Sequence, residues 1–104
     1  MNPAESCLLS DLIEYQNESV VSKTLIAKPS GTVTLFAFDK GQSLSEHTAP
    51  FDALANVVEG QADVTILGRN NLVSAGELIL MPANQPHAIV ARERMKMMLI
   101  MIRS

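Results

Sequence analysis

Hydrophobic and polar residues alternate along much of this chain in short segments, a pattern typical of β-strands. Turn-forming residues, mainly Gly, Pro and Asn, interrupt the pattern and leave segments of roughly five to eight residues, which is strand length and too short for independent helices. The predicted strands span residues 20–27, 32–38, 53–59, 62–68, 77–81, 87–91 and 96–102. The pattern therefore predicts an all-β fold.

So many short strands would leave exposed strand edges unless they close into a barrel or pack as a sandwich. One hairpin turn is predicted at residues 68–71 (GRNN), because Gly and Asn tolerate the positive φ that tight turns require. The N-terminal segment 8–15 (LLSDLIEY) fits a short helix and an edge strand equally well. No repeat, low-complexity tract or linker divides the sequence, so one domain is predicted over residues 1–104.

Composition and charge narrow the class of protein. The chain has eight Lys and Arg against eleven Asp and Glu and no basic run, so nucleic acid is not an expected partner. The N-terminus lacks the features of a signal peptide, and the longest apolar stretch, residues 95–102, is too short to cross a bilayer. We therefore expect a cytoplasmic protein that does not enter a membrane. Cys7 is the only cysteine, which excludes an internal disulfide and a CxxC site.

Two groups of residues stand at characteristic spacings. They are Gly41, His47 and Gly60, and then Gly76, Pro82 and His87. In these spacings the chain resembles the cupin superfamily, whose first motif is Gly, five residues, His-x-His, three or four residues, Glu, six residues, Gly. The second family motif is Gly, five residues, Pro, x, Gly, two residues, His, three residues, Asn. The resemblance implies one cupin domain with a double-stranded β-helix, or jelly-roll barrel, which pairs as a homodimer.

Several positions depart from the family pattern. Alanine stands at two of the usual metal-ligand positions, and two further motif positions also differ. These four residues are Ala49 in place of the second histidine, Ala53 in place of the glutamate, Asn84 in place of the second-motif glycine, and Ala91 in place of the asparagine. The resemblance leaves His47 and His87, the only histidines of the chain, at ligand positions.

These two imidazoles are the candidate functional groups. Strand alternation places Ser45, His47 and Ala49 on one face, and the resemblance implies that this face and the face of His87 line the barrel interior. Imidazole is a common ligand for transition metals. His47 and His87 are therefore candidate ligands for one divalent ion, Fe, Mn, Ni, Cu or Zn.

A third ligand for such an ion has two candidates. Asp52 would contribute a carboxylate if a bulge turned it inward, although ordinary alternation points it away from His47. Gln85 lies close to His87 in the sequence and offers an amide oxygen. A metal-free interpretation stays open, in which each imidazole is buried and hydrogen-bonded to a neighbour.

The alanines suggest a pocket as well, because replacing His and Glu by Ala removes volume from the interior. The residues expected to line it are His47, Ala49, Ala53, His87, Ala91, Phe36 and Phe38. A small organic ligand would suit such a mostly apolar pocket with two polar groups. The predicted function is binding of a small molecule, with a divalent metal as candidate cofactor. Two enzymatic alternatives remain, namely a metal-dependent cupin dioxygenase or isomerase and metal-free acid–base catalysis by one histidine.

Overall fold

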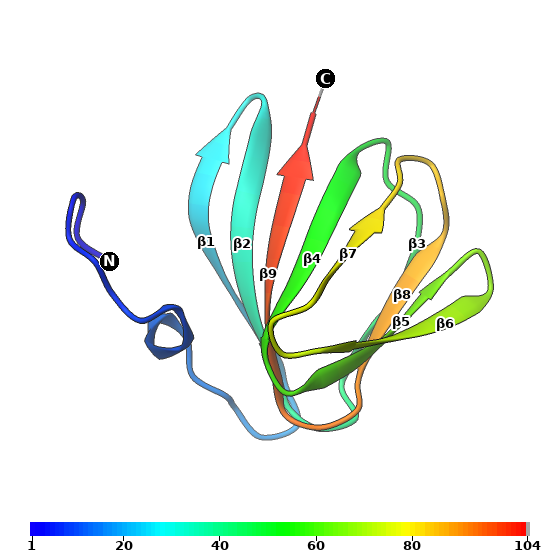
Figure 1. The fold of residues 1–104 in the computed structure, drawn as a ribbon, viewed down its shortest axis with the longest axis horizontal. Coiled ribbons are helices and arrows are strands. Elements are labelled where there is room, and N and C mark those ends of the chain that lie inside the picture. The colour runs from blue at the N-terminus through cyan, green and yellow to red at the C-terminus, as the bar shows by residue number, and fades with distance from the viewer. Residues whose placement is uncertain (104) are drawn as a thin grey trace.

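The computed structural model describes residues 1–103, and nearly all of their regular structure is strand (Figure 1). A single 3-10 turn, η1 (Leu9–Leu12), precedes the strands. The strands are β1 (Val20–Lys28), β2 (Gly31–Phe38), β3 (Ser43–His47), β4 (Asp52–Glu59), β5 (Gln61–Ile66), β6 (Arg69–Ser74), β7 (Leu78–Met81), β8 (His87–Ala91) and β9 (Met95–Ile102). The all-β prediction is confirmed, and the N-terminal segment contains a short helix rather than an edge strand.

The strands form two antiparallel sheets, with the orders β1-β2-β9-β4-β7 and β3-β8-β5-β6. Strands far apart in the sequence lie side by side, because β9 runs between β2 and β4, and β8 runs between β3 and β5. Such interleaving is typical of a jelly roll, in which the chain crosses repeatedly between two packed sheets. Figure 1 shows the two sheets facing each other, close together at one end and apart at the other. The last strands of the sheets, β7 and β6, are not paired with each other.

The main hydrophobic core lies between the two sheets. Alternate residues of each strand point into it, as a half-buried sheet requires. On β2, for example, Phe38 has no exposed surface, and Phe36 packs against the same cluster. The buried members of this core cluster are Phe38, Ala53, Ala55, Val57, Ala62, Val64, Val73, Met81, Ile89, Ala91, Met95 and Met97.

The hairpin between β5 and β6 corrects one prediction. The register pairs Ile66 with Arg69, so the turn consists of Leu67 and Gly68 alone. Both have positive φ, 52° and 75°, as a two-residue hairpin turn of this hand requires. Residues 69–71 belong to strand β6, because each of them pairs with a residue of β5. Of the four residues predicted for the turn, only Gly68 lies in it.

The N-terminal segment covers part of the outer face of the five-stranded sheet. Ile13 is buried there against Leu35 and Ala37 of β2, which have no exposed surface. A second, smaller apolar cluster therefore lies on the outer side of the five-stranded sheet, away from the main core. No helix within residues 1–103 is long and apolar enough to cross a membrane.

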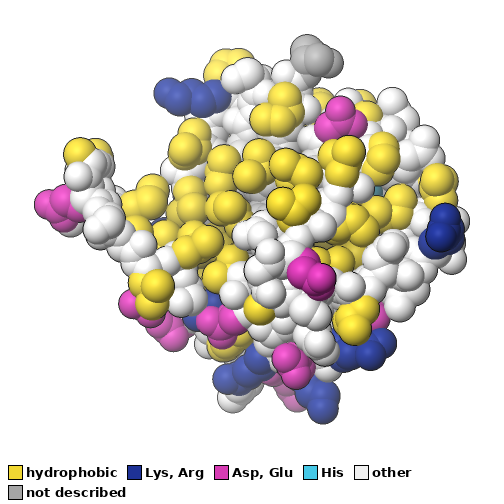
Figure 2. Space-filling view, viewed as in Figure 1, with side chains coloured by type: hydrophobic (Ala, Val, Ile, Leu, Met, Phe, Trp, Pro, Cys, Tyr) yellow, Lys and Arg dark blue, Asp and Glu magenta, His cyan; other side chains and the backbone are white. Residues whose placement is uncertain are grey.

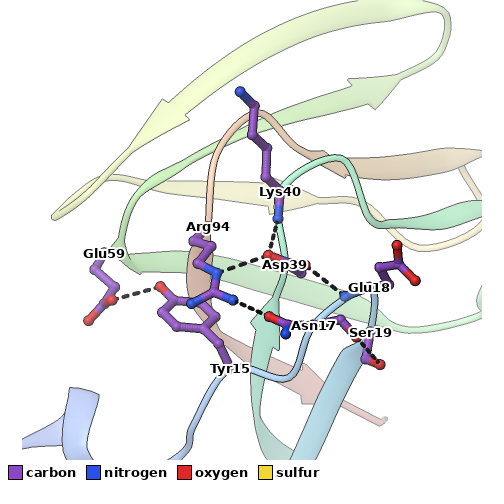
Figure 3. A network of polar contacts seen from close by, with 8 residues as sticks. All are labelled: Tyr15, Asn17, Glu18, Ser19, Asp39, Lys40, Glu59 and Arg94. Carbon is purple, nitrogen blue, oxygen red and sulfur yellow. Dashed lines mark hydrogen bonds and ion pairs between the residues drawn. The ribbon is translucent and has the colours of Figure 1, made fainter.

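Polar contacts hold this N-terminal segment to the sheet (Figure 3). The Tyr15 hydroxyl donates a hydrogen bond to Glu59 at 2.6 Å, and the Tyr15 ring lies 5.1 Å from Arg94 Cζ and 5.0 Å from Lys96 Nζ. Burial, followed by the hydrogen bond to Glu59, raises the pKa of Tyr15 above its usual value. Lys96 is itself buried and donates to the Ser10 carbonyl at 2.6 Å.

Asp39 anchors the end of the same segment (Figure 3). The backbone N–H of Glu18 donates to Asp39 Oδ2 at 2.7 Å, and Arg94 Nε donates to Asp39 Oδ1 at 2.9 Å. These contacts, with the Glu18 N–H first, lower the pKa of Asp39. Arg94 also donates to the Asn17 side chain at 2.8 Å, so one guanidinium joins the β8–β9 turn to the N-terminal segment.

Candidate functional site

The two histidines face each other across neighbouring strands. His47 ends β3, His87 begins β8, and the antiparallel register pairs them directly. The register is irregular between Leu44 and His47, because three steps on β3 match the two steps from Ile89 to His87 on β8. This bulge puts Leu44, which packs against the core, and His47 on the same side of the strand. Simple alternation had placed Ser45 with His47, and the bulge overturns that part of the prediction.

The imidazoles are in direct contact at their Nε2 atoms, which lie 3.1 Å apart. The ring centroids are 4.3 Å apart, and the ring planes meet at 70°. His87 is only 6% exposed, whereas His47 lies at the surface. The pair therefore connects the edge of the core to solvent.

The other ring nitrogen of each histidine faces a backbone carbonyl oxygen. His47 Nδ1 lies 3.0 Å from the Ser45 carbonyl oxygen, and His87 Nδ1 lies 3.3 Å from the Gln85 carbonyl oxygen. Because a carbonyl only accepts, each Nδ1 makes a hydrogen bond there only when it carries a proton. A neutral imidazole has one ring proton, so both Nε2 atoms then present lone pairs to each other. Two lone pairs 3.1 Å apart call for a cation between or beside them, either a proton or a metal ion.

The environment favours the neutral form of His87. Burial lowers its pKa, the positive charge of His47 adds to this effect, and the hydrogen bond to the Gln85 carbonyl opposes it. Neutral imidazole is the form that binds a metal. The buried member of the pair is therefore kept in the protonation state that a ligand requires.

The pair fits a transition-metal ion in donor type and spacing. Metal–nitrogen bonds of about 2.0–2.1 Å allow one ion to span the separation of 3.1 Å between the two Nε2 atoms. When it carries the ring proton, each Nδ1 also donates to a backbone carbonyl, the usual support for a ligating imidazole. Within residues 1–103 no third His, Cys, Asp or Glu joins the pair to form a larger cluster.

Asp52, one of the two candidates for a third ligand, makes a different contact in this structure. Asp52 Oδ1 accepts a hydrogen bond from the Ala83 N–H at 2.9 Å and is not in a cluster with the histidines. No bulge turns Asp52 inward, and the next residue, Ala53, takes the core side of β4. Gln85, the other candidate, supports His87 through its backbone carbonyl.

The predicted pocket residues occupy two kinds of position. Ala53, Ala91 and Phe38 are buried core residues, at 6%, 1% and 0% exposure. Neighbours therefore fill the space beside the small side chain of Ala91. Phe36 is half-buried, with its ring 6.0 Å from that of Phe38, and Ala49 is half-buried beyond the end of β3. Of the predicted lining, His47 is exposed, and Phe36 and Ala49 are half-buried.

Asn84 shows how the second motif keeps its shape without the family glycine. Its φ is 64°, in the left-handed region that glycine favours and that Asn tolerates better than most residues. In this conformation its N–H donates to the Ala49 carbonyl at 2.8 Å. The loops that follow His47 and precede His87 are thereby joined.

The fold is a two-sheet jelly roll, and two imidazoles face each other at the ends of its neighbouring strands β3 and β8. These two features together define the class of protein. A family model for the cupin domain matches residues 34–103, which is well over half of the chain. The chain therefore belongs to the cupin family, as the motif spacing predicted. No curated protein matches the chain.

Solved structures agree with this assignment. A conserved protein of unknown function from Streptococcus pyogenes is 31% identical, with a TM-score of 0.95 over 100% of this chain and 91% of its own. A cupin superfamily protein from Desulfitobacterium hafniense is 27% identical, with a TM-score of 0.95 over 100% of this chain and 95% of its own. A Cupin 2 conserved barrel domain protein from Leptotrichia buccalis is 41% identical, with a TM-score of 0.87. That match covers 91% of this chain but only 46% of the Leptotrichia chain.

Sequence reasoning missed the contacts around Tyr15 and Lys96. The structure joins Asp39, Glu59 and Arg94 to the N-terminal segment, and nothing in the local sequence pattern around these residues indicated that contact. One signal was available, because Lys96 is the only charged residue in the apolar strand β9. A lysine there either interrupts the strand or is buried with partners.

Proposed function

We propose that this cupin binds one divalent transition-metal ion through His47 and His87. The observation that carries the proposal is the arrangement of the four ring nitrogens. Each Nδ1 faces a backbone carbonyl, and the two Nε2 atoms converge at 3.1 Å. This arrangement presents two lone pairs at a separation that one ion spans.

Two imidazoles select among metals by chemistry. Imidazole nitrogen suits Fe, Ni, Cu and Zn, whereas Mg, Ca and Mn prefer oxygen ligands. An ion held by two side chains keeps further coordination positions for water or for a small organic ligand with oxygen or nitrogen donors. The surface position of His47 leaves such a ligand a route from solvent. We therefore extend the proposal to a small molecule bound at the metal.

The cytoplasm is the compartment that we expect for this activity. Cys7 is exposed and free, and a reducing compartment would keep this thiol from pairing with another chain.

Metal analysis and calorimetry test the proposal. Protein purified without chelator should carry near-stoichiometric transition metal, and the EDTA-treated protein should bind added Zn²⁺ or Ni²⁺ at one site per chain. His47→Ala and His87→Ala should each weaken binding by at least about tenfold, because each removes one of the two nitrogen ligands. Asp52→Asn is the matched control, since its side chain accepts from Ala83 and lies apart from the pair.

Two outcomes would refute the metal proposal. One is the absence of saturable binding of any of the five metals to folded protein. The other is equal binding by the double variant His47→Ala/His87→Ala and the wild type. For the small molecule, acetohydroxamate is a suitable probe of open coordination positions. It should raise the melting temperature of the metal-loaded protein and leave that of the metal-free protein unchanged.

A further inference from the structure

The histidine pair belongs to a row of residues that continues across the four-stranded sheet to an arginine. The register of β3 and β8 pairs His47 with His87. On the other side of β8, strand β5 pairs Ile66 with His87, and strand β6 pairs Arg69 with Ile66. We call His47, His87, Ile66 and Arg69 the inner row. Residues that pair directly in an antiparallel sheet project to the same side, so Arg69 lies on the face that carries the imidazoles.

This side of the sheet is the one that faces the main core. On β6, Val73 lies on the same side as Arg69 and is buried in the core cluster. The residue after Arg69, Asn70, points the other way, where it donates a hydrogen bond to Asp63 at 3.1 Å. Arg69 therefore occupies an inward-facing position at the exposed end of β6, rather than a position on the outer surface of the sheet.

A hollow of about 300 Å³ lies beside this end of the inner row, between β6 and β7. Its lining includes Ile66 and Arg69 of the row, Asn71 from the same side of β6, and Ile79 and Pro82 from β7 and the loop after it. Figure 2 shows hydrophobic side chains between β7 and the hairpin of β5 and β6, with Lys or Arg atoms at the tip of that hairpin. Within residues 1–103, β6 and β7 do not pair with each other, so the hollow is open to solvent.

Arg69 brings a positive charge to this hollow. Three ion pairs form within the described part of the chain, and none of them includes Arg69. The aliphatic side chains of Ile66, Ile79 and Pro82 beside it offer no acceptor. A guanidinium binds a carboxylate through two parallel N–H groups. The hollow therefore suits an organic carboxylate with an aliphatic body.

We propose that the ligand of the histidine-bound metal is an aliphatic acid whose carboxylate binds Arg69. This inference rests on the proposed metal site, because the ion at His47 and His87 would hold the other end of the ligand. Neighbouring strands lie about 4.8 Å apart, so His87 and Arg69, which are two strands apart, are separated by about 10 Å at the backbone. Ile66 lies between them and offers apolar surface to the hydrocarbon of the ligand. Arg69 is thus a specificity-determining residue that selects a negatively charged ligand and does not bind the metal.

Calorimetric titration of the full chain, loaded with Zn²⁺ or with whichever of the five metals binds, tests this inference. The probes are monohydroxamates of dicarboxylic acids, in which two to six methylene groups separate the metal-binding hydroxamate from the carboxylate. At least one acid of the series should bind about five- to tenfold more tightly than its own methyl ester, which keeps the chain and loses the charge. Arg69→Met should abolish this advantage of the acid. Arg69→Lys should retain part of it, because lysine keeps the charge and lacks the planar fork.

Lys40→Met is the matched control. It removes the same charge from the turn before β3, at the opposite end of that strand from His47, and should leave the advantage of the acid intact. Arg69→Gln repeats the test if Arg69→Met fails to fold by circular dichroism. Metal titration of the same variants should give the wild-type affinity, since Arg69 is not a ligand of the ion.

The outcomes separate this inference from the metal proposal. If the wild type binds none of the five metals, the proposed function fails and the inference fails with it. If metal binds and no acid surpasses its ester, the inference alone is overturned. An advantage that survives in a folded Arg69→Met or Arg69→Gln variant, or that Lys40→Met abolishes, overturns it as well. An advantage present in the wild type and in Lys40→Met, and absent from the variants that lack the Arg69 charge, supports it.

Discussion

Replacement of Tyr15 tests whether the N-terminal segment is part of the folded domain. Tyr15→Phe removes the hydroxyl that donates to Glu59 at 2.6 Å and keeps the ring between Arg94 and Lys96. Tyr15→Leu removes the ring as well. The two variants therefore separate the hydrogen bond from the contacts of the ring with the two cations.

The magnitudes follow from these contacts. A hydrogen bond to a charged group contributes about 1.5–3 kcal/mol when it is buried. The Glu59 side chain is 42% exposed, so water replaces part of the lost bond, and Tyr15→Phe should cost about 1 kcal/mol in the free energy of unfolding. Each cation beside the ring adds about 0.5–1 kcal/mol, so Tyr15→Leu should cost about 2–3 kcal/mol.

Urea unfolding at fixed protein concentration measures both effects, since a dimer would make the midpoint depend on concentration. A double-mutant cycle of Tyr15→Phe with Glu59→Gln should give a coupling of about 1 kcal/mol, because each single variant removes the same hydrogen bond. The reasoning would be refuted if Tyr15→Leu were no more destabilising than Tyr15→Phe. A coupling within error of zero would equally show that the hydroxyl contact does not stabilise the fold.

Three further predictions concern the histidine site and the motif turns. Because burial lowers the pKa of His87, its contribution to stability should be complete above the usual imidazole pKa of about 6.5 and be lost as the pH falls through the lower folded value. The urea midpoint of EDTA-treated protein should thus fall as the pH is lowered, and the fall should be smaller in His87→Gln. A midpoint that changes with pH equally in the variant and the wild type would contradict this role of His87. Gly60→Ala should cost about 2–4 kcal/mol, because φ is +81° and a Cβ would clash with the Arg94 carbonyl. Gly41→Ala, with the same φ of +81° but open space, should cost only about 1 kcal/mol, and equal losses in thermal or urea unfolding would rule out the clash. The free energy of unfolding of Asn84→Gly should lie within about 0.5 kcal/mol of the wild-type value, and Asn84→Val should lose about 1–2 kcal/mol. Equal stability of the two variants would show that the positive φ of 64° does not restrict this position.

Much of the fold could be predicted from local pattern. Alternation of apolar and polar residues located seven of the nine strands within residues 1–103 and missed β3 and β6, because a half-buried strand imposes a period of two on its own sequence only where its pattern is regular. The spacing of the motif glycines and histidines pointed to the cupin fold, which the family match over residues 34–103 confirms. The hairpin after β5 was placed too late. Asn70 and Asn71 are residues that favour turns, but here they pair with β5 as part of strand β6.

The candidate site was predicted only in part. The sequence by itself determined that two imidazoles and several alanines occupy the motif positions, since residue type and spacing are local facts. Only the tertiary structure decided that the two Nε2 atoms lie 3.1 Å apart beside a bulge, that Asp52 accepts a hydrogen bond from the Ala83 N–H, and that neighbours fill the space beside Ala91. It also decided that Ile13 covers Leu35 and Ala37 on the outer side of the five-stranded sheet, because burial depends on segments that meet only after folding. A strand's own sequence encodes which side faces inward, and it cannot encode what lies against the other side.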